Sequence, residues 1–328
     1  MITGSGPTIE DIRALRDSIS ERIVRTPVTR CAAIEDLLAN DTKVYAKLEF
    51  LQRTGTFKAR GALANMLALT TEQLQRGVTA VSAGNHAIAT AFAAQAVGTT
   101  AKVVMTASAN PWRVAACKAY GGEVIIADDV HQAFERVNSI RDEEGRFFVH
   151  PFEGPAIALG TGGVGLEICE QVEAFDTLLV PVGGGGLIGG ISNAVKQLRP
   201  DAQIVGVEPE GADTMHRSFA SGQPERIDSV HTIADSLGAP FAMEYSYRLT
   251  QDNVDRLTLV SDDELRISMG FLFNQMSLAV EPACAATTAA LLGPLRSSLA
   301  GQTVVIVMCG SNIDWATFQE QASFDEIS

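Results

Sequence analysis

The sequence lacks the features that mark membrane and exported proteins. None of its apolar runs reaches membrane-spanning length. The first residues, MITGSGPTIEDIRALRDSI, do not form a basic-then-apolar signal and are typical of an amphipathic helix capped near Thr8. No low-complexity segment and no short repeat is present. We therefore expect a protein that does not associate with membranes.

Cysteine and positive charge are also in short supply. The 5 cysteines are scattered without C-x-x-C spacing, which indicates neither a disulfide framework nor a zinc site. Reduced thiols are typical of a cytoplasmic protein. The 25 Lys and Arg residues face 39 Asp and Glu residues, a net charge of -14. Nucleic acid is therefore not expected as a partner, although a locally positive site for a small anion remains possible.

What the sequence does contain is an alternation of short apolar strands and helices. We expect strands at 44–48, 79–82, 102–105, 124–127, 177–182, 204–208 and 303–308. Helices are expected at 57–69, 85–97, 111–120, 130–142, 187–198, 211–221, 262–275 and 282–292. This order predicts an α/β fold with parallel-rich sheets covered by helices, and ligands at the carboxyl ends of strands.

The first chemical candidate is Lys58, in the segment Q-R-T-G-T-F-K-A-R-G-A. A lysine at a helix start is either a surface residue or a buried amine with a lowered pKa. Composition alone favours the surface position. A buried amine would suit Schiff-base chemistry.

The second candidate is the segment S-A-G-N-H from Ser82 to His86, between an expected strand and an expected helix. Small residues there expose backbone N–H groups that could bind a carboxylate. The alternative is an ordinary helix start capped by Asn or Ser, with a structural His86.

The third candidate is the run of four glycines from Gly183 to Gly186, which ends a strand and opens a helix. Its N–H groups could wrap a phosphate with the helix dipole behind it. The same stretch matches G-x-G-x-x-G, and Glu208 follows at the distance of a ribose-binding acid, so a nicotinamide site is an alternative. No G-K-[ST] follows, so a P-loop is not indicated. Cys309 follows the last strand, as a core thiol or a weak hydrogen-bond partner.

Together the segments TGTFKARGA, SAGNHA, PVGGGGLIGG and CGSNID resemble the fold-type II pyridoxal-phosphate (PLP) enzymes, specifically the serine/threonine dehydratase and serine racemase group. The resemblance runs from about residue 23 to residue 314. It implies a two-domain fold similar to the tryptophan synthase β-subunit. The large PLP-binding domain would comprise 1–52 and 149–328, and the smaller domain 53–148.

The resemblance also implies roles for individual residues. Lys58 would hold PLP as a Schiff base and remove the α-proton. The cofactor would further contact Phe57, Asn85, Gly183, Gly184, Gly185, Gly186, Leu187 and Cys309. The substrate would contact Ser82, Ala83, Gly84, Asn85, His86, Asp235 and Ser236. A neutral thiol facing the pyridine nitrogen weakens the ring as an electron sink, which favours loss of a β-substituent.

Several positions depart from the pattern of this group. Ala83 stands where the racemases have serine, so racemisation is not expected. The cation site of the racemases resembles Glu208, the Ala212 carbonyl and Thr214. The missing third carboxylate weakens such a mono- or divalent cation site. Phe134 stands where the racemases have a substrate-contacting arginine. We therefore expect a substrate with a larger or less polar β-substituent than serine.

The sequence thus predicts an ammonia-lyase that removes the β-hydroxyl of an L-3-hydroxy amino acid and forms a 2-oxo acid and ammonia. Threonine, serine, 3-hydroxyaspartate and 3-phenylserine are all candidate substrates. A racemase or a β-replacement enzyme of the same fold, a nicotinamide-dependent oxidoreductase and a non-catalytic amino-acid-binding protein remain alternatives. The resemblance to this group also implies a homodimer.

Overall fold

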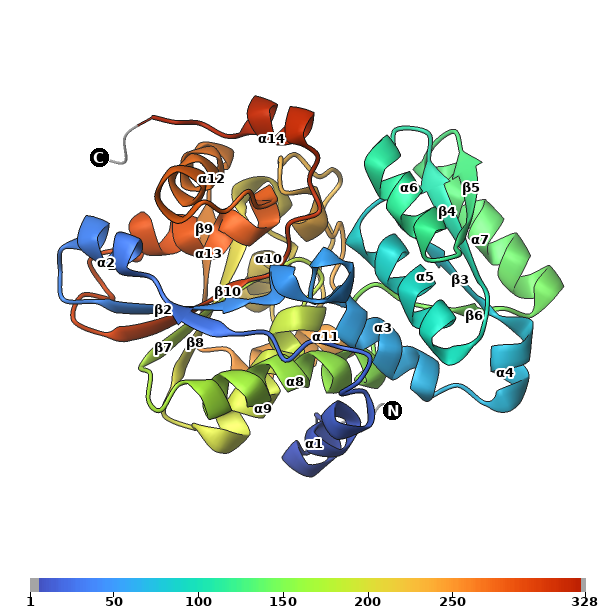
Figure 1. Cartoon of the computed structure of the whole chain (residues 1–328), viewed down its shortest axis with the longest axis horizontal. Coiled ribbons are helices and arrows are strands. Elements are labelled where there is room, and N and C mark those ends of the chain that lie inside the picture. The colour runs from blue at the N-terminus through green and yellow to red at the C-terminus, as the bar shows by residue number, and fades with distance from the viewer. Residues whose placement is uncertain (1–5, 326–328) are drawn as a thin grey trace.

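Six strands form the larger of two sheets in the computed structural model, which describes residues 6–325 (Figure 1). Their spatial order is β1 (Val28–Arg30), β2 (Lys43–Leu48), β10 (Thr303–Met308), β7 (Thr177–Pro181), β8 (Gln203–Pro209) and β9 (Arg256–Val260). All neighbours are parallel except β1, which pairs antiparallel with β2. The inner strands β7 and β10 are almost wholly buried, as their apolar sequences require in a parallel sheet covered on both faces.

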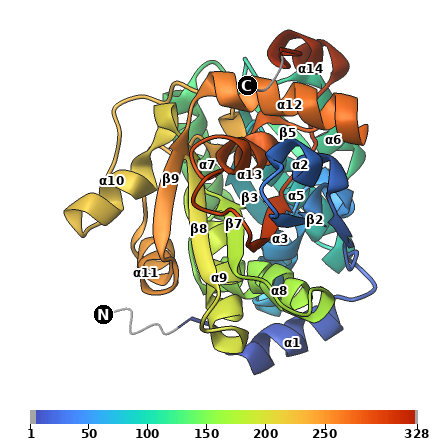
Figure 2. The same ribbon diagram turned by 90° about the vertical axis from the view of Figure 1, so that its left-hand side faces the viewer.

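Helices cover both faces of this sheet. In Figure 1, α8 and α9 lie on one side of it and α12 and α13 on the other. Figure 2 shows the same layers after a quarter turn, with α1 beneath α8 and α14 beyond α12. The helices of this larger unit are α1 (Ile9–Ser18), α2 (Ala32–Leu38), α8 (Pro155–Gln171), α9 (Gly186–Leu198), α10 (Thr214–Ser221), α11 (Glu244–Asn253), α12 (Asp262–Met276), α13 (Pro282–Leu292) and α14 (Trp315–Gln321).

A smaller unit lies beside the larger one (Figure 1). Its four parallel strands have the order β5 (Glu123–Ala127), β4 (Ala101–Thr106), β3 (Val78–Val81) and β6 (Phe147–Phe148). Its helices are α3 (Lys58–Leu67), α4 (Thr71–Arg76), α5 (Asn85–Val97), α6 (Pro111–Ala119) and α7 (Val130–Glu144). Short 3-10 turns complete the elements: η1 (Glu49–Leu51), η2 (Arg53–Gly55), η3 (Glu210–Ala212) and η4 (Asp235–Leu237).

The α/β class and the expected strands are confirmed, and Thr8 caps α1 through a capping box with Asp11. The sequence did not predict α8, because four glycines interrupt its helical pattern. Close packing explains them. A Cβ on Gly160 would lie 2.5 Å from the carbonyl oxygen of Arg60, and one on Gly165 would lie 2.7 Å from that of Ile191. The glycines thus allow α8 to pack tightly against α3 and α9.

Two expectations concerned membrane-spanning helices and disulfide bonds. Across residues 6–325, no helix combines the length and the apolarity needed to span a membrane. All five cysteines are free thiols, four of them buried and Cys169 partly so.

Candidate active site

Lys58 is the first residue of α3 and follows a sharp bend at η2. Thr54 has φ 68° and Gly55 has φ 72°, so the chain turns abruptly before the helix starts. The Nζ of Lys58 donates a hydrogen bond to the carbonyl oxygen of Pro151 at 2.7 Å and lies 5.1 Å from the centre of the Phe57 ring. Burial lowers the pKa of Lys58 to about 8. At pH 7 about one tenth of this amine is then neutral, against roughly one in three thousand for an ordinary lysine, which makes it a competent nucleophile toward an aldehyde.

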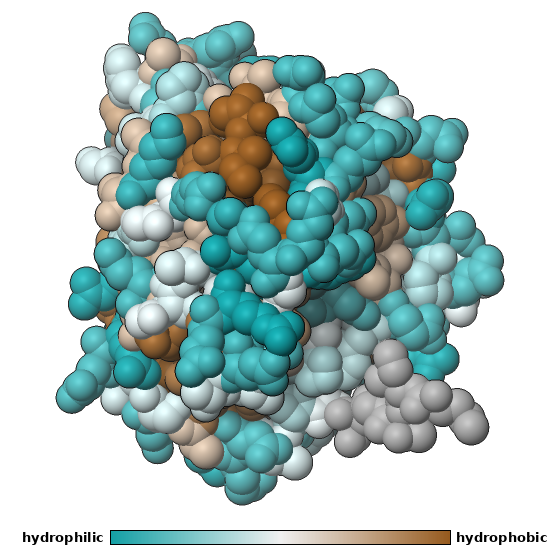
Figure 3. Space-filling view, turned by 90° about the vertical axis from the view of Figure 1, so that its right-hand side faces the viewer, coloured by the Kyte–Doolittle hydropathy of each residue, from teal (hydrophilic) through white to brown (hydrophobic). Residues whose placement is uncertain are grey.

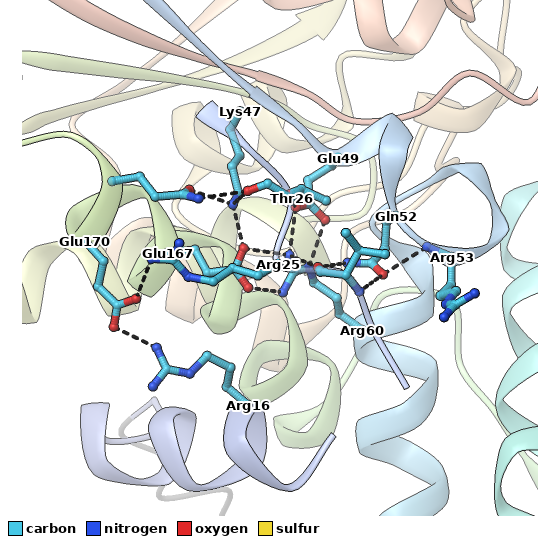
Figure 4. A network of polar contacts seen from close by, with 12 residues as sticks. Arg16, Arg25, Thr26, Lys47, Glu49, Gln52, Arg53, Arg60, Glu167 and Glu170 are labelled. Atoms are coloured by element: carbon cyan, nitrogen blue, oxygen red, sulfur yellow. Dashed lines mark hydrogen bonds and ion pairs between the residues drawn. The ribbon is translucent and has the colours of Figure 1, made fainter. Parts of the chain in front are cut away.

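A fully buried group of four charges fixes the start of α3 (Figure 4). Arg60 donates to Glu49 at 2.8 Å and to Glu167 at 2.8 Å, and Lys47 also pairs with Glu167. These residues come from β2, η1, α3 and α8, so the group joins α3 to the larger unit. The two positive charges of this group balance its two negative charges, so removal of one partner would leave an uncompensated buried charge. The arrangement therefore restricts where the backbone of Lys58 lies.

The four glycines form a tight loop between β7 and α9. Gly185 has φ 87°, which favours glycine. A Cβ on Gly184 would lie 2.3 Å from the Phe152 ring, and one on Gly186 would lie 2.6 Å from the Phe152 carbonyl oxygen. Only glycine fits at these positions. The loop thus presents backbone N–H groups at the start of α9, the arrangement that binds a phosphate.

Asn85, at the start of α5, is held in one orientation by Asn312. The side-chain Nδ2 of Asn312 donates to the Oδ1 of Asn85 at 2.8 Å. The Nδ2 of Asn85 then donates to the Glu281 carboxylate at 2.8 Å and to the Ser236 hydroxyl at 3.1 Å. Asn85 therefore directs its hydrogen-bond donors, not its acceptor, at the residues of the cavity, which suits an anionic oxygen of a ligand.

Glu281 was not singled out from the sequence. It is 1% exposed, and burial raises the pKa of its carboxyl group to about 7 despite the nearby Arg113. Its sequence signal, an acid directly before the proline that opens α13, is typical of an ordinary helix start. Its contact with Asn85 spans 196 positions, which no local pattern reveals.

Cys309 follows β10 and is buried beside a second thiol, Cys284. The hydrogen bond with Cys284 and burial raise the pKa of Cys309 well above its usual value, so it stays a neutral thiol. The backbone N–H of Phe57 donates to the Cys309 carbonyl oxygen at 3.2 Å, which ties the two segments together.

One cavity collects all the residues predicted to contact the cofactor. Its wall is made of Phe57, Lys58, Asn85, Phe152, Pro181, Gly183, Gly184, Gly185, Gly186, Leu187, Ser236, Leu237, Glu281, Ala283 and Cys309. A nucleophilic lysine, a phosphate-type glycine loop and the side-chain amide of Asn85 thus face one space. This combination fits PLP, whose aldehyde, phosphate and phenolic oxygen need these three kinds of partner.

A second cavity of about 550 Å³ adjoins the first and shares Lys58, Asn85, Phe152, Gly184 and Ser236 with it. All seven residues predicted to contact the substrate line it. The His86 ring is engaged with the backbone, because its Nε2 lies 2.8 Å from the Val149 carbonyl oxygen, and burial lowers its pKa to about 3. Much of the remaining wall is apolar: Val81, Val104, Val130, Ala133, Phe134, Phe148, Val230, Ala239, Pro240 and Phe241.

Two of the three residues predicted for a cation, Glu208 and Thr214, are engaged with protein groups. The Glu208 carboxylate accepts hydrogen bonds from the backbone N–H of Met215 at 2.8 Å and of His216 at 2.7 Å. The Thr214 hydroxyl donates to the Ala239 carbonyl oxygen at 2.7 Å. Between residues 6 and 325, no group of three or more His, Cys, Asp or Glu side chains could hold a metal ion. Glu208 thus stabilises the start of α10. The nicotinamide alternative needed the same carboxylate as a ribose-binding acid, and its oxygens already accept these two backbone hydrogen bonds.

The chain belongs to the pyridoxal-phosphate dependent enzyme family, whose profile matches residues 19–310. Within it, the chain is 53% identical over 312 residues to the phenylserine dehydratase of Ralstonia pickettii, which covers 95% of both chains. It is 35% identical to the L-threonine ammonia-lyase of Thermotoga maritima, over 94% of this chain and 76% of that one. A solved structure of maize serine racemase superposes with a TM-score of 0.90 at 33% identity, over 96% of this chain and 97% of that one.

These similarities confirm the predicted PLP cofactor and the predicted class, a PLP-dependent lyase of the ammonia-lyase type. The nicotinamide alternative is wrong.

Proposed function

We propose that the preferred substrate is an L-3-hydroxy amino acid with an aromatic ring on its β-carbon, for which 3-phenylserine is the reference compound. The observation that carries the proposal is the apolar wall of the cavity beside Lys58, which includes Phe134, Phe148 and Phe241. Transfer of an aromatic ring from water onto such a wall is favourable. The relative that is 53% identical bears the name of the same activity.

We assign the cofactor to the residues of the first cavity. Lys58 would hold it covalently, the loop from Gly183 to Gly186 would bind its phosphate, and Asn85 would donate to its phenolic oxygen. When bound, PLP supplies a ring that stabilises negative charge on the substrate's α-carbon. Cys309, a neutral thiol, would face the ring nitrogen without placing a charge there.

The segment from Ser82 to His86 would bind the α-carboxylate through backbone N–H groups at the start of α5. That contact would orient the α-hydrogen toward Lys58, the base that removes it. Loss of the β-hydroxyl yields an enamine, which becomes an imine and hydrolyses to a 2-oxo acid and ammonia. Ala83 offers no acid on the opposite face of the α-carbon, so elimination would prevail over racemisation.

The proposal is tested by the rate of 2-oxo acid release from 3-phenylserine, threonine, serine and 3-hydroxyaspartate. We expect the highest kcat/KM with 3-phenylserine and no release by Lys58→Ala. A higher kcat/KM with serine or threonine would overturn the substrate assignment. Full activity of Lys58→Ala would overturn the assignment of the catalytic lysine.

Three further expectations join this proposal. We propose the division into a large domain (1–52 and 149–328) and a smaller one (53–148), a homodimer, and a cytoplasmic location supported by the five free thiols. A bound cation forms no part of it, because Glu208 is satisfied by backbone N–H groups. Light scattering of the holoenzyme with and without a chelator tests both the dimer and the absence of a structural cation.

A further inference from the structure

Arg113 extends from α6 of the smaller unit and meets two carboxylates of the larger unit. Its Nη1 pairs with Asp235, and its Nη2 lies 3.3 Å from the other oxygen of the same carboxylate. The same Nη2 is 3.9 Å from the Glu281 carboxylate. Its Nε donates to the Asn312 carbonyl oxygen at 3.2 Å. One guanidinium thus spans the boundary between the two units, with its side chain only 11% exposed.

The two carboxylates belong to different cavities. Asp235 lines the substrate cavity and its side chain is 56% exposed. Glu281 lines the cofactor cavity, is 1% exposed and accepts the hydrogen bond of Asn85. Arg113 is therefore the charged link between the space where the substrate enters and the amide that faces the cofactor.

We propose that Arg113 is a positioning residue of the reaction, which keeps Glu281 ionised as the acceptor that orients Asn85 toward the cofactor. Asp235 competes for the same guanidinium from the substrate side. The strength of the Arg113–Glu281 contact therefore depends on how closely Arg113 is held by Asp235. The link to catalysis rests on the proposed dehydratase function, whereas the link to cofactor binding does not.

The signs of the charges make the proposal testable. The charged and titratable groups that face Glu281 are Arg113 of α6, Asp235 of η4, Lys58 of α3 and Cys309 after β10. Burial raises the pKa of Glu281 to about 7, Arg113 lowers it and Asp235 raises it. Loss of the Arg113 charge should therefore raise this pKa further, and loss of the Asp235 charge should lower it.

The first experiment measures kcat/KM against pH for the holoenzyme with 3-phenylserine. The native enzyme should lose activity on the acid side with an apparent pKa near 7, since Glu281 must be ionised. Arg113→Met should move this limb to higher pH, and Asp235→Asn should move it to lower pH. Arg113→Lys should restore the native position, and Glu281→Gln, which has no group that titrates, should abolish the limb.

The second experiment measures cofactor affinity by titrating PLP into the apoenzyme, with quenching of protein fluorescence as the signal. At pH 7, Arg113→Met should bind PLP about fivefold more weakly, since a rise of about one unit in the pKa of Glu281 would lower its ionised fraction from about one half to about one tenth. The loss should diminish as the pH rises and Glu281 ionises. Arg76→Met removes an exposed arginine that pairs with Glu72 on α4 and is the matched control, with affinity and profile unchanged.

The proposal is overturned if Arg113→Met and Asp235→Asn shift the acid limb in the same direction, or if the limb persists in Glu281→Gln. It is also overturned if Arg113→Met lowers only the melting temperature, because a merely structural ion pair would do the same. If the native protein does not turn over 3-phenylserine, the proposed function fails, and the cofactor titration still tests the role of Arg113.

Discussion

The amide of Asn312 donates to the amide oxygen of Asn85 at 2.8 Å, and this bond determines which end of Asn85 faces the cofactor cavity. In Asn312→Asp the donor is lost, and a carboxylate would repel the Oδ1 of Asn85. The Asn85 side chain should then turn and present its oxygen toward Glu281 and the cavity. An unsatisfied buried polar group costs about 1–3 kcal/mol, so PLP affinity should fall about 5- to 150-fold. Titration of the apoenzyme measures the change.

A matched control for this substitution is Asn253→Asp. The Asn253 side chain donates to the Leu249 carbonyl oxygen at 2.8 Å near the end of α11, outside both cavities. Its replacement should leave PLP affinity unchanged. Equal losses in the two variants would mean that the orientation of Asn85 does not govern cofactor binding.

Phe134 should be a determinant of substrate choice. It lines the substrate cavity from α7, and its 43% exposure places it at the cavity's edge. Figure 3 shows a hydrophobic patch on the face formed by the smaller unit. Ile126 and Val130 of the same unit are also exposed. Phe134→Arg would put a charge against the substrate ring, so kcat/KM for 3-phenylserine should fall about 5- to 150-fold, the equivalent of about 1–3 kcal/mol.

The same variant should gain activity toward 3-hydroxyaspartate relative to 3-phenylserine, because arginine pairs with a carboxylate. Leu67→Arg adds the same charge at an exposed position on α3 outside the substrate cavity. It should change neither kcat/KM for 3-phenylserine nor the activity toward 3-hydroxyaspartate relative to 3-phenylserine. An unchanged preference in Phe134→Arg would place the substrate ring elsewhere in the cavity.

The capture of PLP by the apoenzyme should depend on pH through Lys58. Only the neutral amine attacks an aldehyde, and the pKa of Lys58 is lowered to about 8. The rate of covalent capture should therefore rise with pH and reach half its maximum near pH 8. Stopped-flow absorbance measures this rate. A midpoint at the ordinary lysine value of 10.5 would show that Lys58 is not desolvated.

Glu167 and Glu170 offer a matched pair on α8 for the buried charge group (Figure 4). Glu167→Gln leaves Arg60 and Lys47 buried with too little negative charge, so the free energy of unfolding should fall by about 3–5 kcal/mol. Glu170 pairs with Arg16 and Arg25 at the surface, and Glu170→Gln should cost less than about 1 kcal/mol. Urea unfolding of both variants measures the difference, and similar losses would contradict the role assigned to the buried group.

Local sequence predicted that Lys58, Asn85 and the glycine loop lie at the starts of helices, but it favoured a surface position for Lys58, and the family resemblance assigned all three to one site. Each lies where a strand or bend meets a helix, and small residues around it restrict what the backbone can do there. The sequence also predicted the apolar character of Phe134. These features depend on neighbours in the chain, so they are visible in short segments.

The residues that the sequence did not reveal depend on contacts between distant segments. Phe152 fills the space left by Gly184 and Gly186, yet by itself it is one aromatic residue in a loop. Glu281 and Arg113 meet only because the long Arg113 side chain extends from α6 of the smaller unit to within 3.9 Å of the carboxylate that precedes α13. The glycines of α8 made its sequence unlike that of a typical helix. In the structure they allow α8 to approach α3 and α9 closely.

The walls of the substrate cavity have an evolutionary consequence. Phe134 comes from α7, and Phe241 comes from the segment between η4 and α11, whereas neither lines the cavity that holds the cofactor residues. Mutations in these two segments therefore change which β-substituent fits without disturbing the covalent anchor or the phosphate loop. On this scaffold, substrate preference can therefore diverge through substitutions in these two segments while the residues that hold the cofactor stay unchanged.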